Sequence, residues 1–133
     1  MKHPFRLLIF LSVLVVGSSF TVPNCRCRPL SFEEEVATAD QIFTGRVLSR
    51  AATDVVTYTF ATSRSFKGVR GDTLTVQTGR GGGDCGAFFT VGGSYLIYAR
   101  DGRTNTCRRN APIDKTADVE ALTKLFSKRR YEP

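Results

Sequence analysis

The stretch "DVVTYTFATSRSF" (residues 54–66) decides the fold class, because apolar and polar residues alternate along it. Val56, Tyr58 and Phe60 would point to one face of a strand, and the threonines between them would point to the other. The β-branched and aromatic residues that fill the stretch favour an extended backbone. The sequence therefore predicts a β-strand with one buried face.

Neighbouring stretches extend this pattern to most of the chain. Residues 41–50, 73–78 and 94–100 are also rich in Val, Thr, Tyr and Phe, and glycine or aspartate bounds them. Shorter strands are expected at "AFFTV" (87–91) and "RTNTC" (103–107). Five or six short strands in succession predict a mainly β fold, a small closed or partly open antiparallel barrel.

One helix is predicted before this strand-rich region and one after it. The segment "SFEEEVATAD" (31–40) opens with Ser31 and has Glu34 three residues later, the pattern of a capping box. Near the C-terminus, apolar residues recur at helical spacing in "DKTADVEALTKLFSKRR" (114–130). The barrel should therefore carry two flanking helices.

The first residues have the pattern of a signal peptide. Residues 1–19 begin with basic side chains, continue with an apolar run over 7–16 and end in small residues; cleavage is expected between residues 18 and 24. The apolar run is far shorter than the ~20 residues that span a bilayer as a helix. We therefore expect a secreted protein, or a periplasmic one in a bacterium, with no membrane contact after cleavage. A lipoprotein lipidated at Cys25 is disfavoured, because Val22-Pro23-Asn24 is a poor lead-in.

The remaining chain, residues 25–133, has the length of one domain. Its charge is basic, since the whole chain carries a formal net charge of +7. The basic residues are not interleaved with an aromatic stripe on which bases could stack, so no nucleic acid partner is expected. Solvated surface charge is favoured over a polyanion site, and the domain is expected to be a monomer.

The inventory of reactive groups argues against an enzyme. The only histidine is His3, which lies in the predicted signal peptide. Histidine-dependent nucleophiles and histidine-containing zinc sites are thereby excluded from the mature chain. The acidic residues lie in a helix, in turns or near the C-terminus, and none is marked as half of a catalytic pair. No catalytic residue and no cofactor are predicted.

Four cysteines remain, at positions 25, 27, 85 and 107. Their spacing does not resemble the paired knuckles of a zinc site, and export favours oxidation. Two disulfides are therefore expected. A bond between Cys25 and Cys27 would close a very tight ring. Two long-range pairings remain open, and in either one the segment "CRCRP" (25–29) is held at two points.

Two further motifs have ordinary structural interpretations. The glycine run "GRGGGDCG" (79–86) lacks the ending of a phosphate-binding loop, and no helix pattern follows it. We interpret it as a loop tied down at Cys85. The tripeptide Arg70-Gly71-Asp72 occurs in cell-adhesion ligands, but here it lies between two predicted strands, where Gly and Asp are common turn residues.

The order of these features resembles the netrin-like module, and in particular the inhibitory domain of the tissue inhibitors of metalloproteinases. The signal peptide, "CRCRP", the short helix, "ADQIFTGRV", "YTFATSRSFKG", the loop ending in "CG", "GGSYLIYA" and a later cysteine follow in that family's order. The resemblance covers nearly all of residues 25–113. Its most specific element is the C-x-C-x-P start.

The resemblance implies a five-stranded OB-type barrel, stapled by disulfides between Cys25 and Cys85 and between Cys27 and Cys107. It also implies a secreted inhibitor of a zinc metalloprotease. The Cys25 amine and carbonyl would chelate the target's zinc, provided that Cys25 is the mature N-terminus, and Arg26 would enter the specificity pocket. The implied binding ridge consists of Cys25, Arg26, Cys27, Arg28 and Pro29, beside Gly83 and Asp84. The alternative is a netrin-like module without inhibitory action that binds an extracellular protein or a polyanion.

Overall fold

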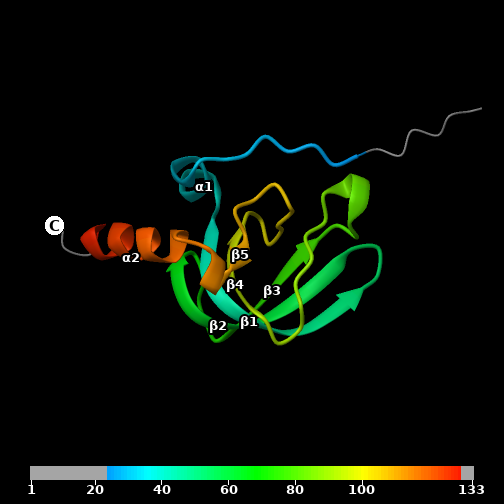
Figure 1. The fold of residues 1–133 in the computed structure, drawn as a ribbon. Coiled ribbons are helices and arrows are strands. Elements are labelled where there is room, and N and C mark those ends of the chain that lie inside the picture. The colour runs from blue at the N-terminus through cyan, green and yellow to red at the C-terminus, as the bar shows by residue number, and fades with distance from the viewer. Residues whose placement is uncertain (1–23, 130–133) are drawn as a thin grey trace, which may run out of the picture.

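The computed structural model describes residues 24–129, and the signal peptide predicted for residues 1–19 lies outside them. In the described part of the chain, one five-stranded antiparallel sheet has the order β3-β2-β1-β4-β5 and is accompanied by two α-helices (Figure 1). The strands are β1 (Gln41–Ala52), β2 (Val56–Lys67), β3 (Thr73–Thr78), β4 (Ser94–Ala99) and β5 (Ala111–Pro112), and the helices are α1 (Phe32–Thr38) and α2 (Asp118–Arg129). The predicted mainly β class and both helices are confirmed. Neither helix is long and apolar enough to cross a membrane.

The long strands β1 and β2 form the centre of the sheet. Their ladder is interrupted by three shifts of register, after Ile42, Thr44 and Val47. Such irregularities increase the local twist of a strand pair. Gly45 is required at one of them, because a Cβ atom there would lie 2.9 Å from the carbonyl oxygen of Ala61. The strongly twisted β1 pairs with β4 through its first half while it pairs with β2 along its whole length.

The sheet has a core on each face. As predicted, Val56, Tyr58 and Phe60 of β2 are buried, and they pack in one cluster with Phe89. The rings of Tyr58 and Phe89 meet edge to face, with centroids 5.1 Å apart. Burial of such aromatic side chains is a large favourable contribution to folding.

The second core lies between the sheet and the helices. Ile42 of β1 and Tyr98 of β4 pack there against Val36 of α1 and Leu122 of α2. The sheet thereby fixes both helices. In addition, the Lys67 ammonium group at the end of β2 donates hydrogen bonds to the Val36 and Ala39 carbonyls at 2.8 and 2.6 Å, where α1 ends. A cation is favourable at this negative end of a helix.

The strand predicted at residues 87–91 is wrong. These residues form no strand ladder, although Ala87 and Phe89 are buried as a strand would bury them. Side-chain oxygen atoms accept the backbone hydrogen bonds that a neighbouring strand would otherwise accept. The Phe89 backbone N–H donates to the Tyr58 hydroxyl at 3.2 Å, and the Ala87 N–H donates to Thr78 Oγ1 at 2.8 Å.

The strand predicted at residues 103–107 is also wrong, and the fifth strand is instead the two-residue β5. Arg103 makes only isolated bridges. The Gln77 N–H of β3 donates to the Gly102 carbonyl, and the Thr104 N–H donates to the Gln77 carbonyl, both at 2.9 Å. The segment that follows β4 therefore runs beside the β3 edge of the sheet without forming a strand of its own.

Candidate functional site

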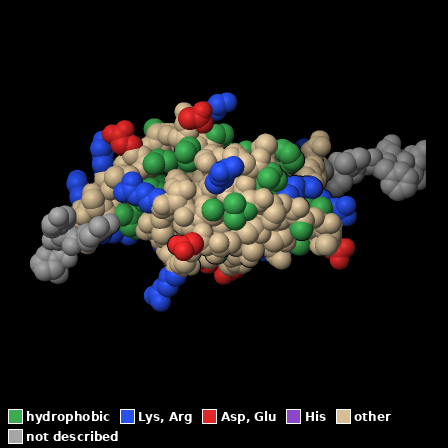
Figure 2. All heavy atoms as spheres, turned by 90° about the horizontal axis from the view of Figure 1, so that it is seen from below, with side chains coloured by type: hydrophobic (Ala, Val, Ile, Leu, Met, Phe, Trp, Pro, Cys, Tyr) green, Lys and Arg blue, Asp and Glu red, His purple; other side chains and the backbone are tan. Residues whose placement is uncertain are grey.

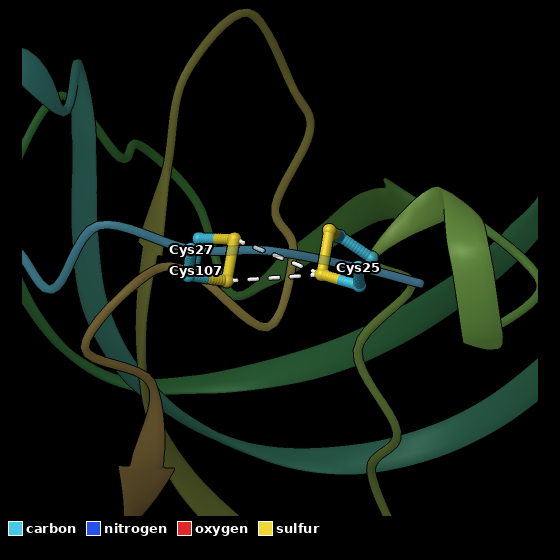
Figure 3. A group of neighbouring side chains, drawn as sticks. Cys25, Cys27 and Cys107 are labelled. Carbon is cyan, nitrogen blue, oxygen red and sulfur yellow. Dashed lines mark hydrogen bonds between the residues drawn. A yellow bond between two sulfur atoms is a disulfide. The ribbon is translucent and has the colours of Figure 1, made fainter. Parts of the chain in front are cut away.

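Two disulfides fasten the N-terminal segment to the fold. The structure bonds Cys25 to Cys85 and Cys27 to Cys107, the connectivity that the resemblance implies. The Cα atoms are 5.0 and 5.1 Å apart, within the usual range for a disulfide. The two bonds lie side by side, since Cys25 Sγ is 3.7 Å from Cys27 Sγ (Figure 3). The chain that carries them crosses above the sheet, next to the loops that contain Cys85 and Cys107 (Figure 1).

Residues 25–29, here called the N-terminal ridge, are extended chain outside any helix or strand. Cys25 is half-buried, whereas Arg26, Cys27, Arg28 and Pro29 are exposed. Arg26 makes no hydrogen bond or ion pair with another of residues 24–129. A segment that is fixed by two covalent bonds and still presents its side chains to solvent is suited to contact with a partner.

Arg28 differs from Arg26 because its charge is engaged locally. Its guanidinium group donates to Glu34 Oε1 at 2.9 Å. Glu34 Oε2 in turn accepts the Ser31 backbone N–H at 2.9 Å, and the Glu34 N–H donates to Ser31 Oγ, which completes the predicted capping box. The Ser31 backbone hydrogen bond and then Arg28 hold the pKa of Glu34 below its usual value. The ridge therefore continues into a well-defined start of α1.

Asp84, predicted as part of the ridge surface, is turned into its own loop. Its carboxylate accepts backbone N–H groups from Arg80 at 2.7 Å and from Gly81 and Gly86 at 2.9 Å. These hydrogen bonds, the one from Arg80 foremost, hold the pKa of Asp84 below its usual value. Gly86 cannot carry a side chain, because a Cβ atom would lie against the Gly79 backbone. Asp84 thus shapes the loop that presents Gly83 and Cys85.

Two ionic contacts that were not predicted from the sequence, one buried and one partly buried, directly follow the second disulfide in the chain. Arg108 follows Cys107 and donates to Glu35 Oε1 of α1 at 2.7 Å; the Glu35 side chain is 0% exposed and that of Arg108 is 14% exposed. Arg109 donates to both carboxylate oxygens of Asp118 in α2 at 2.7 Å. The Cys107 loop is therefore held to both helices. The sequence contains one signal for the Glu35 contact, because helical spacing places Glu35 on the apolar face of α1.

The Arg109–Asp118 pair extends to Tyr98 of β4. The Tyr98 hydroxyl donates to Asp118 Oδ2 at 3.0 Å. The hydrogen bonds from Arg109, in the first place, hold the pKa of Asp118 below its usual value, whereas burial and then the Asp118 charge raise the pKa of Tyr98. Arg109 also donates to the Leu30 carbonyl at 3.4 Å, one residue beyond the ridge. This network joins the ridge, the sheet and α2.

Two surface features lie near the ridge. A polar cavity of about 390 Å³ opens beside Asp84. It is lined by Asp54, Val55, Gly79, Asp84, Arg100, Asp101, Arg103, Thr104, Asn105 and Arg108. Phe88 is the most exposed large apolar side chain of the described residues, at 74%. It lines a small pocket together with Thr106, whose backbone N–H donates to the Cys85 carbonyl at 2.8 Å. Cationic and apolar groups therefore both lie near the N-terminal ridge.

Comparison of the chain with protein-family models and with curated proteins finds no match. The resemblance described above therefore depends on the residues that carry it, and the arrangement of side chains is the basis for assigning a function. The site offers an exposed, covalently held segment in which the Arg26 guanidinium group has no ion-pair or hydrogen-bond partner among residues 24–129. That arrangement is chemically suited to binding.

Proposed function

We propose that this chain is a secreted, netrin-like inhibitor of a zinc metalloprotease that acts through the N-terminal ridge and is not itself an enzyme. The observation that carries the proposal is the exposure of residues 26–29 in a segment that disulfides hold at Cys25 and Cys27. Binding usually costs conformational entropy, because mobile segments must become ordered. Here the disulfides have already fixed the segment, so little of that cost remains.

In the proposed mechanism, the α-amine and the carbonyl oxygen of Cys25 bind the zinc ion of the target protease. A neutral amine and a carbonyl oxygen both carry lone pairs that zinc accepts. The Arg26 side chain, which has no partner among residues 24–129, enters the pocket beside the zinc. The mechanism requires that processing leaves Cys25 as the first residue.

The glycine loop forms the second wall of the proposed contact surface. Gly83 is exposed, and its position follows from the hydrogen bonds that the Asp84 carboxylate makes inside the loop. The Cys25–Cys85 bond ties this wall to the ridge. Asp84 would therefore act by positioning Gly83, with its own carboxylate engaged in hydrogen bonds within the loop.

We also propose that the sheet closes into an OB-type barrel. The hydrogen bonds of Gln77 with Gly102 and Thr104 support this closure, because they connect the β3 edge to the segment that directly follows β4. In solution, the backbone N–H groups of Gln77 and Thr104 should exchange with solvent as slowly as those of the β1–β2 ladder. Rapid exchange at both positions would show an open sheet.

The inhibitor proposal is tested with proteins that begin at Cys25. One added alanine before Cys25 should abolish inhibition of a sensitive metalloprotease without changing the thermal stability, since it blocks the amine. Inhibition should also weaken as the pH falls through the amine pKa, ~7.7 to 8.0 when unperturbed, because the protonated amine has no lone pair. Arg26→Thr should change which proteases are inhibited, whereas Arg50→Thr, at an exposed arginine of β1, should not. Equal inhibition with and without the added alanine would refute the proposal.

A second candidate function is that of a non-inhibitory module that binds a polyanion. The observation in its favour is that Arg100, Arg103 and Arg108 line one cavity near the ridge. Three aspartates, at positions 54, 84 and 101, line the same cavity and offset this charge. On the face seen in Figure 2, the basic side chains are scattered among acidic and apolar ones, which gives a polyanion no continuous track. This candidate predicts binding to a sulfated polysaccharide that falls steeply with salt and is unaffected by the added alanine.

A further inference from the structure

The four cysteine sulfur atoms converge in space although their positions in the sequence are far apart. They come from the ridge, from the glycine loop and from the loop after β4. All four sulfur atoms lie within 4.8 Å of one another. Between the two disulfides, Cys25 Sγ is 3.7 Å from Cys27 Sγ and 4.0 Å from Cys107 Sγ (Figure 3).

We propose that this cluster is a four-cysteine zinc site when both disulfides are reduced. Zinc prefers four thiolates in a tetrahedron with Zn–S distances of about 2.3 Å, which places the sulfur atoms about 3.8 Å apart. The separations between the two disulfides, 3.7 and 4.0 Å, already match that spacing. On reduction the two bonded pairs of sulfur atoms would move apart to the same spacing, and no pair of sulfur atoms is more than 4.8 Å apart. Zinc would thus hold together the same three segments that the disulfides join.

Contacts outside the disulfides keep these segments close. The Thr106 backbone N–H donates to the Cys85 carbonyl at 2.8 Å, which joins the two loops that carry Cys85 and Cys107. Arg108 and its buried partner Glu35 hold the second of these loops to α1. Reduction therefore removes the covalent bonds without removing every contact that places the thiols.

The surroundings also suit the charge of the complex. Zinc with four thiolates has a net charge of −2. Among the arginines adjacent to the cysteines in the chain, Arg28 and Arg108 pair with Glu34 and Glu35, whereas Arg26 has no ion pair among residues 24–129. The Thr106 hydroxyl is 3.6 Å from Cys25 Sγ and could donate a hydrogen bond to a thiolate. Outer-shell donors of this kind orient and stabilise metal ligands.

The reaction balances with a phosphine as the reductant. Each disulfide accepts two electrons from one phosphine, and water supplies the two protons for the thiols and the oxygen of the phosphine oxide. The four thiols then lose four protons when they bind zinc. The oxidised protein cannot form this site, because its sulfur atoms are bonded to one another.

The test uses the purified protein, reduced with a phosphine in the absence of air. Native mass spectrometry should show one zinc ion per reduced chain and none per oxidised chain. Cobalt(II) in place of zinc should give the intense visible absorption of a tetrahedral thiolate complex. Cys85→Ser should weaken zinc binding by more than the roughly 10–100-fold that loss of an outer-shell partner costs. Ser65→Ala, at an exposed serine of β2, is the matched control and should leave binding unchanged.

Folding provides a second readout, because the reduced chain could lose structure. Zinc added to the reduced protein should restore the near-ultraviolet circular dichroism of the buried tyrosines, or preserve it if structure was not lost. The same reduced chain in concentrated urea should bind zinc far more weakly. The absence of one-to-one binding, an octahedral cobalt spectrum, or equal affinity in urea would each overturn the proposal.

Discussion

Replacing Arg108 by leucine should lower the free energy of unfolding by about 3–5 kcal/mol, because the Glu35 carboxylate would stay buried without its cation. The Glu35 side chain is 0% exposed. One of its oxygen atoms accepts from Arg108 at 2.7 Å, and the other, Oε2, has no partner among the described residues. Little else is therefore available to stabilise the charge.

An exposed ion pair of similar length provides the comparison. Lys124 and Glu120 in α2 are 2.7 Å apart, but their side chains are 71% and 73% exposed. Solvent already stabilises both charges, so Lys124→Leu should leave the free energy of unfolding nearly unchanged. The double variant Glu35→Leu with Arg108→Leu should recover most of the stability that the single change removes, since no buried charge is left.

Urea unfolding with the disulfides intact measures these differences. With a slope of about 1–3 kcal/mol per molar urea, the Arg108→Leu midpoint should fall by at least about 1 M. A loss below about 1 kcal/mol, or a double variant no more stable than Arg108→Leu, would refute the account of a buried pair behind the Cys107 disulfide.

Three further predictions concern other contacts of the site. Because Arg109 lowers the pKa of Asp118, their pair should stabilise the protein fully above the unfolded-state pKa of ~3.9 and lose this effect as the pH falls through the lower folded-state pKa. Asp118→Asn should therefore make the free energy of unfolding less dependent on pH in the acid range. An unchanged dependence on pH would contradict this. Serine at both positions of the Cys25–Cys85 bond should cost about 3 kcal/mol in the chain-entropy model, because the retained Cys27–Cys107 bond shortens the loop that this disulfide closes. Urea unfolding measures the cost, and a value under about 1 kcal/mol would contradict this prediction. Ser31→Ala should cost about 1 kcal/mol through loss of the capping box, seen as a lower thermal midpoint, and an unchanged midpoint would show that the cap contributes nothing.

The parts of the fold that could be predicted are those that depend on local sequence. The alternation over residues 54–66 and the capping box at Ser31 each involve neighbours along the chain, and both elements form as expected. The strand prediction at residues 87–91 is wrong because hydroxyl groups of distant residues, Tyr58 among them, accept hydrogen bonds from its backbone N–H groups. No local pattern reveals such partners. The two-residue β5 contains Pro112, a residue that discourages a strand prediction.

The candidate site could likewise be predicted only where it depends on local sequence. The cysteines and the exposed ridge could be located from the sequence, but residue spacing left two long-range disulfide pairings open. The contacts of Glu35 and Arg108 join positions 73 residues apart, and only the folded chain brings them together. Asp84 is assigned to the contact surface by the resemblance, and the hydrogen bonds that its carboxylate makes within the loop cannot be deduced from a glycine-rich sequence.

The Cys27–Cys107 bond also determines how the domain would carry mechanical load. A pulling force applied between Cys25 and α2 follows the covalent path from Cys27 across the disulfide to Cys107, and so bypasses the chain from residue 28 to residue 106. All of β1 to β4 lies in the bypassed part. Tension would therefore fall first on the segment after Cys107, including β5 and the contact of Arg109 with Asp118, and stretching would unravel α2 while β1 to β4 stay folded.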